Sequence, residues 1–401
     1  MNGRIFVIGI GADGLEGLGA RARQIIRDAE ILIGGERHLT LVPEGAAKRA
    51  VWGQNFDNGI STIQANRGRR VVVLASGDPM HFGIGSRLLK FFSIDDIEII
   101  PTTGAFSLAA ARMGWSIPDI TCLTLHGRAL EVVNLHLIPE GRLLILSWDG
   151  KTASKLSTLL VKKGYGKSMM SVFENMGGDN EDRLDSLASS WSAEETAALN
   201  TIAVSLKPDP DAVTWSRAAG LPETAYRHDD MITKREVRAI TLAALAPLPG
   251  ETLWDIGAGN GSVAIEWLRL EPSARAVAIE QMLCRAENAR FNADELGVPN
   301  LKLINSAAPA AFEDLDESPD AIFVGGGLST GLLDACWQRL KPGGRFVSNA
   351  VTMEGYAAVL TLRTAVGGEL LKISVGREGK VGSRAVIKPF MDVWQFRGAK
   401  I

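Results

Sequence analysis

The strongest constraint on the fold is a pattern that occurs twice, in which an apolar, β-rich run ends in glycines and leads into a segment with helical periodicity. The first copy is RIFVIGIGADG at 4–14, and the second is ETLWDIGAGNG at 251–261. Glycines in such a turn let the backbone approach a ligand closely, and the following helix points its first amides toward it. Because the copies lie in opposite halves of the 401-residue chain, they predict two α/β domains.

The segment SLKPDPDAVTWSRAAGLPET separates the two halves and contains Pro208, Pro210 and Pro222. Proline fixes φ and removes a backbone donor, so this stretch is a poor helix or sheet interior and a good linker. We therefore expect one domain over 1–207 and another over 208–401. Each is long enough to form its own hydrophobic core.

Both halves alternate between expected strands and helices, which predicts right-handed βαβ crossovers and, in the second half, a doubly wound parallel sheet. The clearest helices are 262–271 and 282–296. The expected strands of the first half are 4–9, 70–75, 97–100, 121–125, 142–147, 169–174 and 200–206. Those of the second half are 251–256, 275–280, 300–304, 320–324, 344–349, 369–375 and 391–396.

Composition excludes several classes of protein. The 43 Lys and Arg against 46 Asp and Glu leave a net charge of -3, without the basic surface of a nucleic-acid-binding protein. No apolar run reaches the roughly 18 residues of a membrane span. The three cysteines cannot form a disulfide framework and lack metal-ligand spacing. We therefore expect no metal site. The apolar run that begins at Ile5 resembles a first core strand more than a signal peptide, so we expect a cytoplasmic protein.

The second glycine motif predicts a nucleoside ligand. Its spacing is G-x-G-x-G, which differs from the G-x-G-x-x-G of dinucleotide sites. Glu280 ends the next expected strand, where a carboxylate can accept hydrogen bonds from ribose hydroxyls. With no second phosphate cradle, S-adenosylmethionine fits, its methionine part on the loop 257–261. The alternative is a structural turn beside a surface acid.

Two neighbouring features bear on this site. Thr233 and Glu236 have the spacing of a capping box, and the helix that follows is expected to bury Val237, Ile240, Ala244 and Leu245. Gly325, Gly326 and Gly327 follow the fourth expected strand, without a catalytic acid or an Asn-Pro-Pro-Tyr motif. This argues against methylation of an amide or adenine nitrogen and suits a large, flat substrate; a simple tight turn is the alternative.

The second half resembles a known family in seven ordered segments, which are MITKREVRAIT, DIGAGNG, AIE, NSAAPAAFEDL, IFVGGG, LKPGGRFVSNAVTME and GSRAVI. They are similar to the C15-methylating, decarboxylating enzymes of cobalamin biosynthesis, over nearly all of 218–401. The resemblance implies a class I, Rossmann-like methyltransferase fold. It also implies an S-adenosylmethionine site formed by Thr233, Asp255, Gly257, Ala258, Gly259, Asn260, Gly261, Glu280, Ala307 and Ala308. The family's usual Gly-Asp-Ala-Pro is Ser-Ala-Ala-Pro at 306–309, which leaves backbone groups to contact the adenine.

The first half resembles a different family. Its glycine loop lacks the Gly-Lys-Ser/Thr of a nucleotide hydrolase. The loop and four later segments, SGDPMHFGIGSRLL, TTGAFSLAAARMGW, LHGR and ENMGG, are similar to the tetrapyrrole methylases (class III), in particular their C5-methylating branch. The resemblance implies two α/β subdomains that bind S-adenosylmethionine through Gly11, Gly77, Asp78, Gly104, Ser107 and Met176. Ala12 replaces the usual proline of the first loop.

Together the two halves resemble the bifunctional C5,15-methyltransferases of cobalamin biosynthesis. That resemblance implies conversion of precorrin-6B to precorrin-8X, with one S-adenosylmethionine per domain, release of CO2 and a homo-oligomeric state. His126 and Glu354 are the candidate catalytic residues. Arginine and lysine near the clefts should bind the substrate carboxylates; the candidate substrate-binding residues are Arg128, Lys234, Arg235, Asn349 and Arg384. His81 is a second-choice histidine, whereas His38, His136 and His228 have no motif support.

Two other functions stay open. Relatives of both folds methylate RNA, although the near-neutral charge argues against a nucleic-acid partner. Alternatively, one domain could be a non-catalytic S-adenosylmethionine sensor that controls the other.

Overall fold

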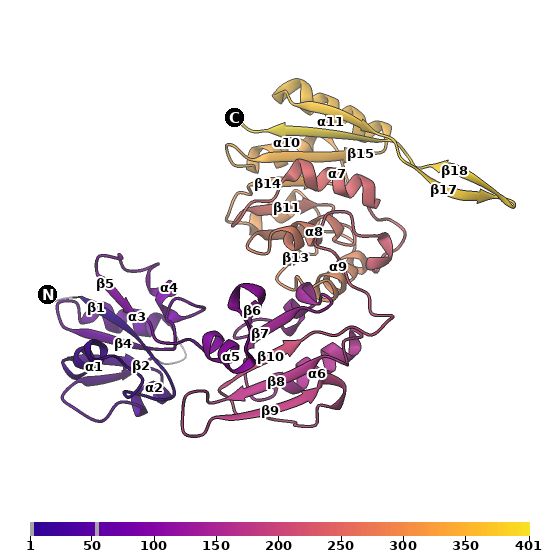
Figure 1. The fold of residues 1–401 in the computed structure, drawn as a ribbon. Helices are drawn as coiled ribbons and strands as arrows, with labels where there is room; N and C mark the ends of the chain where they lie inside the picture. Colours follow the sequence, from indigo (N-terminus) through magenta and orange to yellow (C-terminus); the bar gives the residue numbers. More distant parts are fainter. Residues whose placement is uncertain (1–3, 53–55) are drawn as a thin grey trace. The chain divides into compact units, whose positions relative to one another are not determined.

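The computed structural model describes residues 4–52 and 56–401, which form two compact units. The first unit contains the chain up to residue 130 together with 138–213, and the second contains 131–137 and 214–401 (Figure 1). Among the described residues, no helix combines the length and apolarity needed to cross a membrane.

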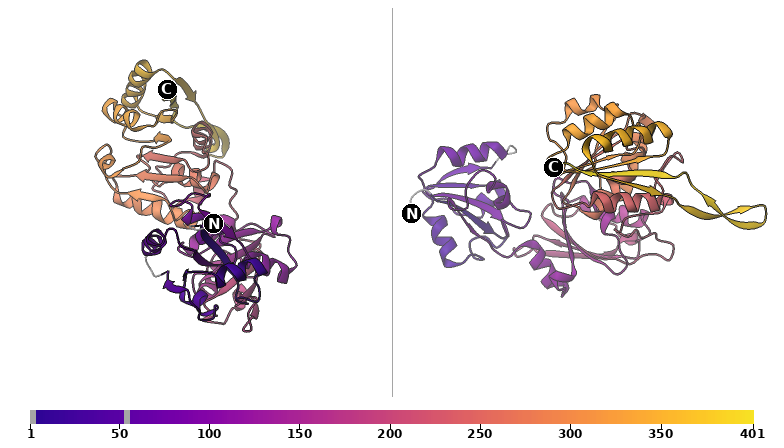
Figure 2. Two further views of the ribbon diagram at one scale, coloured as in Figure 1. Left: turned by 90° about the vertical axis from the view of Figure 1, so that its left-hand side faces the viewer. Right: turned by 90° about the horizontal axis from the view of Figure 1, so that it is seen from above.

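The first unit begins with a fully parallel sheet in the order β3-β2-β4-β1-β5. Alternate residues of β1 face opposite sides: Ile5 and Val7 pack with Ile60 of α3, whereas Ile8 packs with Ile26 of α1. Because helices cover both faces (Figure 2), β1 is apolar throughout. The elements are β1 (Ile5–Ile10), α1 (Ala20–Arg27), β2 (Ile31–Gly34), α2 (Glu36–Thr40), β3 (Lys48–Val51), α3 (Phe56–Ala65), β4 (Val71–Ser76), α4 (Ile84–Leu88) and β5 (Ile97–Ile100).

A second, mixed sheet completes the first unit, in the order β6-β7-β10-β8-β9. Strands β6 and β7 are parallel, whereas β10 runs antiparallel to both β7 and β8. The expected pair of α/β subdomains is therefore confirmed. The elements are α5 (Ala105–Met113), η1 (Ile117–Asp119), β6 (Thr121–Thr124), β7 (Arg142–Leu146), α6 (Thr152–Lys162), β8 (Met169–Glu174), β9 (Asp182–Leu187), η3 (Ala188–Ser190) and β10 (Asn200–Ser205). The short helix η2 (Leu130–His136) lies between β6 and β7 in the chain, but all of it except its first residue belongs to the second unit.

The second unit is built on a seven-stranded sheet in the order β13-β12-β11-β14-β15-β19-β16, which confirms the expected Rossmann-like fold. Strand β19 runs antiparallel to both of its neighbours, a departure from the expected parallel sheet. The strands are β11 (Thr252–Ile256), β12 (Arg275–Ile279), β13 (Lys302–Ile304), β14 (Ala321–Val324), β15 (Arg345–Ala350), β16 (Glu369–Ile373) and β19 (Val393–Ala399). The helices are η4 (Glu223–Ala225), α7 (Arg235–Leu245), α8 (Ser262–Leu270), α9 (Leu283–Glu295), η5 (Ala310–Asp314), α10 (Thr330–Arg339) and α11 (Met353–Val366).

Several strands have no counterpart in the sequence-based expectation. A two-stranded ribbon, β17 (Gly376–Val381) and β18 (Arg384–Pro389), extends from the second unit away from its main sheet (Figures 1 and 2). Strands β2, β3 and β9 of the first unit were also not expected. Strand β9 carries mostly exposed polar side chains, and β3 is a short strand without a continuous apolar run. Strand β2 is apolar and buried but has only four residues.

Seven residues from the middle of the first half, 131–137, belong to the second unit. Asn134 Nδ2 donates to the Asp294 carbonyl at 2.9 Å. Gly297 has a φ of +83°, and a Cβ there would lie 2.2 Å from the Leu135 nitrogen. Only glycine therefore lets this segment pack at the end of α9.

The tightest backbone approach in the first unit yields a stability prediction. A Cβ on Gly9 would lie 1.8 Å from the Gly77 carbonyl oxygen. We expect Gly9→Ala to destabilise this unit by about 1–3 kcal/mol, because the two strand ends must separate. Gly19→Ala is the control, since nothing lies within 4 Å of its Cβ position. Thermal unfolding checks both, and an equal effect of the two variants would contradict the expectation.

Candidate functional site

A pocket of the second unit lies beyond the carboxyl ends of β11, β14 and β15. Its volume is about 540 Å³, within the roughly 300–1,000 Å³ typical of small-molecule sites. The carboxyl ends of parallel strands are the usual place for a ligand in an open α/β sheet. The predicted site residues that line the pocket are Thr233, Lys234, Gly257, Ala258, Gly259, Asn260 and Asn349.

Bare backbone forms one side of this pocket. Gly257 has a φ of +65°, and a Cβ there would lie 3.0 Å from both the nitrogen and the oxygen of Gly326. The loops after β11 and β14 therefore touch through their main chains. Gly325 and Gly326 also line the pocket, so the second glycine cluster contributes to the site.

Glu280 supports the glycine loop from the end of β12. Its carboxylate is buried and accepts hydrogen bonds from the Gly259 amide at 2.8 Å and the Met282 amide at 2.9 Å. The side chain therefore lies beside the loop but outside the pocket lining. Each carboxylate oxygen has a further lone pair, so the ribose contact remains a prediction.

Asp255 lies beneath the same loop, at the end of β11. One carboxylate oxygen accepts a hydrogen bond from the Ala264 amide at 3.0 Å, while Oδ1 is buried without a partner among the described residues. Burial raises the pKa of this carboxyl to about 7, and the negative charge of Glu280 contributes. Since buried polar atoms in native proteins are nearly always paired, Oδ1 is a polar group that a ligand donor or a water can satisfy.

Asn260 joins the glycine loop to the segment that precedes α7. Its side-chain amide donates to Asp229 Oδ1 at 3.0 Å and to the Met231 carbonyl at 3.1 Å, and its oxygen accepts from Asn288 at 2.9 Å. These contacts occupy the side chain structurally. The segment 229–231 therefore has a fixed position beside the pocket.

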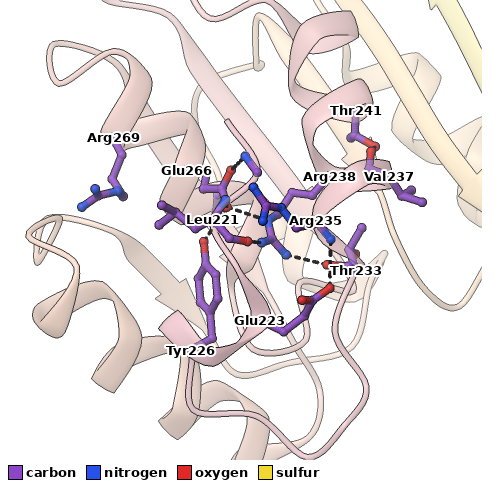
Figure 3. Close-up of polar contacts among 12 residues, drawn as sticks. Leu221, Glu223, Tyr226, Thr233, Arg235, Val237, Arg238, Thr241, Glu266 and Arg269 are labelled. Carbon is purple, nitrogen blue, oxygen red and sulfur yellow. Dashed lines mark hydrogen bonds and ion pairs between the residues drawn. The ribbon is translucent and has the colours of Figure 1, made fainter. Parts of the chain in front are cut away.

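A buried ion pair anchors the segment 220–234, which we call the pocket wall because its last five residues, 230–234, line the pocket (Figure 3). Arg238 Nε of α7 lies 2.6 Å from Glu266 Oε1 of α8, and both side chains are almost fully buried. Arg238 also donates to the carbonyl oxygens of Leu221 and Thr233. Since Thr233 lines the pocket, the ion pair positions a residue of the site directly.

Glu266 receives three further donors from the same wall. The amides of Gly220 and Leu221 donate to it at 2.6 and 3.0 Å, and the Tyr226 hydroxyl donates at 2.8 Å (Figure 3). Burial and the Glu266 charge raise the pKa of Tyr226 well above its usual value. These hydrogen bonds compensate the free-energy cost of removing the Glu266 carboxylate from water.

The predicted capping box at Thr233 is wrong. Helix α7 begins at Arg235 with Lys234 as its N-cap, and no side chain caps it. Glu236 instead forms an ion pair with Arg377 of β17, which lowers the pKa of Glu236. A distant arginine therefore replaces the local contact. Four residues of this helix were expected to be buried. Val237 and Leu245 are buried, whereas Ile240 and Ala244 are half-buried.

Asn349 is held from two sides at the pocket. Its amide donates to Thr241 Oγ1 at 3.0 Å, and its oxygen accepts from Gln395 Nε2 at 2.9 Å. Lys234 lines the pocket without an acidic partner among the described residues, whereas Arg285 is paired with Asp229 at 2.8 Å. Lys234 is therefore the lining cation that is available to an anionic ligand.

The opposite side of the pocket is apolar and was not anticipated from the sequence. Its residues come from β14, β16 and β19, from the position after β15, and from the end of β18 and the segments that flank the ribbon. They are Phe323, Val351, Ile373, Val375, Pro389, Phe390, Met391 and Val393. The only sequence signal for them is the apolar character of the strands, which does not distinguish a core face from a pocket face.

The remaining predicted residues of this unit lie outside the pocket lining. Arg235, Glu354 and Arg384 have exposed side chains. Gly261 begins α8 and packs against Ala289. Ala307 and Ala308 follow β13.

The predicted residues of the first unit gather where β1 and β4 end. A small pocket of about 70 Å³ is lined by Gly11, Gly77 and Met176, among others. A Cβ on Gly77 would lie 3.0 Å from the Gly104 Cα. Asp78 accepts a hydrogen bond from the Met80 amide at 2.8 Å, which stabilises the turn. Ser107 is exposed on α5.

His126 and Arg128 lie by a separate cleft of the same unit, with a volume of about 380 Å³. Arg128 and Trp148 line this cleft, and the His126 ring lies 5.0 Å from the Trp148 ring. Arg128 also lies over the ring of Phe82, 5.6 Å from its centre. Phe82 has a φ of +55° and is 48% exposed. A left-handed, exposed aromatic residue is unusual and marks a candidate functional surface.

Comparison with known proteins finds two separate family matches along the chain, one in each half. Residues 4–190 match the family of tetrapyrrole (corrin/porphyrin) methylases, and residues 224–400 match the precorrin methyltransferase domain. A precorrin-6Y C(5,15)-methyltransferase [decarboxylating] from Sinorhizobium sp. is 42% identical over 98% of this chain and 96% of its own length. One from Mycobacterium tuberculosis (strain CDC 1551 / Oshkosh) is 37% identical over 99% of this chain and 100% of its own length. The crystal structure of the C-terminal domain of precorrin-6Y C5,15-methyltransferase from Rhodobacter capsulatus is 42% identical. It covers 46% of this chain and 100% of that chain, with a TM-score of 0.44.

The buried ion pair yields a stability prediction. We expect Glu266→Gln to lower the free energy of unfolding of the second unit by about 3–5 kcal/mol, because Arg238 would remain buried without its counter-charge. The control is Asp392→Asn, which breaks a half-exposed pair with Lys372 and should have a much smaller effect, because exposed ion pairs contribute little to stability. Calorimetry of the full chain measures both. Equal transition temperatures for the two variants would show that the buried pair does not anchor the wall.

Asp255 yields a prediction about pH. Its folded pKa of about 7 exceeds the roughly 3.9 of an unfolded aspartate, so the folded state binds the extra proton. Ionisation of Asp255 therefore lowers stability as the pH rises through this interval. We expect Asp255→Asn to gain stability relative to the wild type between pH 5 and pH 7. Urea unfolding at several pH values checks this, and a constant difference would contradict the assigned pKa.

Proposed function

The chain belongs to the family of precorrin-6Y C(5,15)-methyltransferases (decarboxylating), and on this premise we propose that it carries two methyl-transfer activities. Residues 1–207 methylate C5 of the tetrapyrrole. Residues 208–401 methylate C15 and decarboxylate the ring C acetate, whose carboxyl group leaves as CO2 while its other carbon stays on the ring as a methyl group. The overall reaction converts precorrin-6B to precorrin-8X, with one S-adenosylmethionine bound in each domain.

The observation that carries this proposal is the composition of the pocket in the second unit. Glycine backbone from two loops forms one side, and eight apolar side chains form another. A backbone surface suits the polar methionine part of S-adenosylmethionine, and an apolar surface suits a flat macrocycle. The unpartnered Asp255 Oδ1 and the cradle around Gly257 both fit a polar ligand at the loop.

When bound, S-adenosylmethionine supplies an electrophilic methyl group on its sulfonium. The residues of the chain bind and orient. Glu280 holds the Gly259 amide in place and can accept hydrogen bonds from a ribose. Because the tetrapyrrole is itself an enamine-rich nucleophile, orientation contributes more than a strong base.

Substrate carboxylates require cations at defined positions, since the net charge of -3 provides no general attraction. In the second domain we assign this role to Lys234, and we propose Asn349 as a neutral hydrogen-bonding residue beside it; both line the pocket. Arg235 and Arg384 are exposed and are proposed to bind carboxylates that extend beyond it. Glu354, in the first turn of α11, is proposed as an acid–base group facing the substrate.

In the first domain we propose that Gly11, Gly77 and Met176 contact S-adenosylmethionine, with support from neighbouring residues Asp78, Gly104 and Ser107. His126 is the proposed acid–base residue. Arg128 is the proposed carboxylate ligand, and the exposed ring of Phe82 beside it offers a surface for the macrocycle. We also propose a cytoplasmic homo-oligomer, as the family resemblance implies.

The two alternatives predict different ligands. An RNA methyltransferase would require a basic surface, which the composition does not provide. A sensor domain would bind S-adenosylmethionine without transferring its methyl group. The experiment below distinguishes this from two active sites.

The direct test is a full-chain assay with precorrin-6B and methyl-labelled S-adenosylmethionine. We expect two labelled methyl groups per product and one CO2. Equilibrium dialysis should show two S-adenosylhomocysteine molecules bound per chain. One bound molecule with one transferred methyl would support a single-site enzyme and overturn the two-site proposal.

A variant of the glycine loop assigns the C15 reaction to the second domain. Gly257→Ala places a Cβ 3.0 Å from Gly326 at a positive φ, so we expect C15 methylation and CO2 release to fall at least about tenfold as the pocket narrows. C5 methylation, assayed on a substrate already methylated at C15, should be unchanged. Gly250→Ala is the control, because Gly250 has a φ of +77° and nothing within 4 Å of its Cβ position. Full C15 activity in Gly257→Ala would contradict the assignment.

A further inference from the structure

The small pocket of the first unit contains a polar cluster to which neither the motifs nor the proposed function assigns a role. It consists of Arg37 and His38 of α2 and Ser76, the last residue of β4. Arg37 Nη2 donates to Ser76 Oγ at 3.0 Å, and His38 Nε2 lies 2.9 Å from the same oxygen. Arg37 and Ser76 both line the pocket, next to Gly11 and Gly77.

Arg37 carries the charge of this cluster. Burial, together with the Arg37 charge, lowers the pKa of His38 to about 4, so the imidazole is neutral at physiological pH. His38 Nδ1 is buried without a partner among the described residues. Arg37 has no carboxylate within ion-pair distance in the part of the chain that the structure describes. Its contacts there are Ser76 and His38, both through Nη2.

The guanidinium therefore has free donors at the edge of a pocket. Arginine presents its N–H groups as a planar fork that matches the two oxygens of a carboxylate. The Ser76 oxygen accepts a hydrogen bond from Arg37, and His38 Nε2 lies 2.9 Å from the same oxygen, so the tautomer of His38 sets the direction in which the Ser76 hydroxyl points. A volume of about 70 Å³ accommodates one polar end of a ligand, whose remainder would extend out of the pocket.

We propose that Arg37 and Ser76 form a carboxylate-binding subsite of the first domain, with His38 as a neutral residue that positions Ser76. This inference rests on the proposed function, because it assigns a ligand group to the same site. Two carboxylates have suitable chemistry. One is the methionine carboxylate of S-adenosylmethionine, and the other is an acetate or propionate of the tetrapyrrole.

The test uses the full chain and the variants Arg37→Gln, Arg37→Lys and Ser76→Ala. C5 methylation is assayed with a substrate already methylated at C15, while KM is measured for both substrates. Loss of a charged hydrogen bond should raise the relevant KM by about 10- to 100-fold in Arg37→Gln. Arg37→Lys should recover part of this loss, because it retains the charge without the fork. Ser76→Ala should show a smaller rise.

The two sources give different results. If the subsite binds the methionine carboxylate, the KM for S-adenosylmethionine rises, and one of the two S-adenosylhomocysteine sites weakens in calorimetric titration. If it binds a tetrapyrrole carboxylate, the KM for the tetrapyrrole rises and both titrated sites are unchanged.

Two internal controls keep the result interpretable. C15 methylation and CO2 release should be unchanged in all variants, which shows that the chain is folded and active. Arg27→Gln removes an exposed arginine of α1 whose side chain contacts Gln24, and it should leave both KM values unchanged. Wild-type KM values in Arg37→Gln would overturn the subsite. Absence of C5 methylation in the wild-type chain would instead overturn the proposed function.

Discussion

The pocket of the second unit depends on the ion pair between Glu266 and Arg238. The wall that it anchors, residues 220–234, contains only the short η4 as regular structure before α7, so its own backbone hydrogen bonds cannot hold it. Glu266 accepts donors from Gly220, Leu221, Tyr226 and Arg238, while Arg238 reaches the Thr233 carbonyl. Burying two charges is costly, and this arrangement is stable because nearly every donor and acceptor is used.

Both units have bare glycine backbone at the carboxyl ends of parallel strands. In the first unit, β1 and β4 approach so closely at Gly9 and Gly77 that a single Cβ would clash. In the second unit, Gly257 and Gly326 meet in the same way. Glycine loops offer backbone N–H and C=O groups but no charged side chains. Charged groups at these pockets therefore come from a few residues at the pocket edges. Arg37 and Lys234 occupy such positions.

The core strands could be predicted because their apolar runs are continuous, as in β1 and β11. Strand β9 could not, since its side chains are mostly exposed and polar. The prediction of a capping box was wrong because it considered only local spacing. Glu236 has the correct spacing from Thr233, but Arg377, far along the chain, forms a stronger contact with it. The apolar side of the pocket was missed because core-facing and pocket-facing apolar residues have the same pattern.

The sequence by itself determined the two α/β halves, the position of the glycine loops and the family, because these depend on local periodicity and on short motifs. Only the tertiary structure decided which charged residues are buried and which line a pocket. Arg238 and Glu266 resemble solvent-facing residues of amphipathic helices, and His38 had no motif support, yet folding buries the first two and places the third beside Arg37 and Ser76. These partners are far apart in the sequence and come into contact only when the strands and helices pack. A local sequence pattern therefore cannot show that they are neighbours in space.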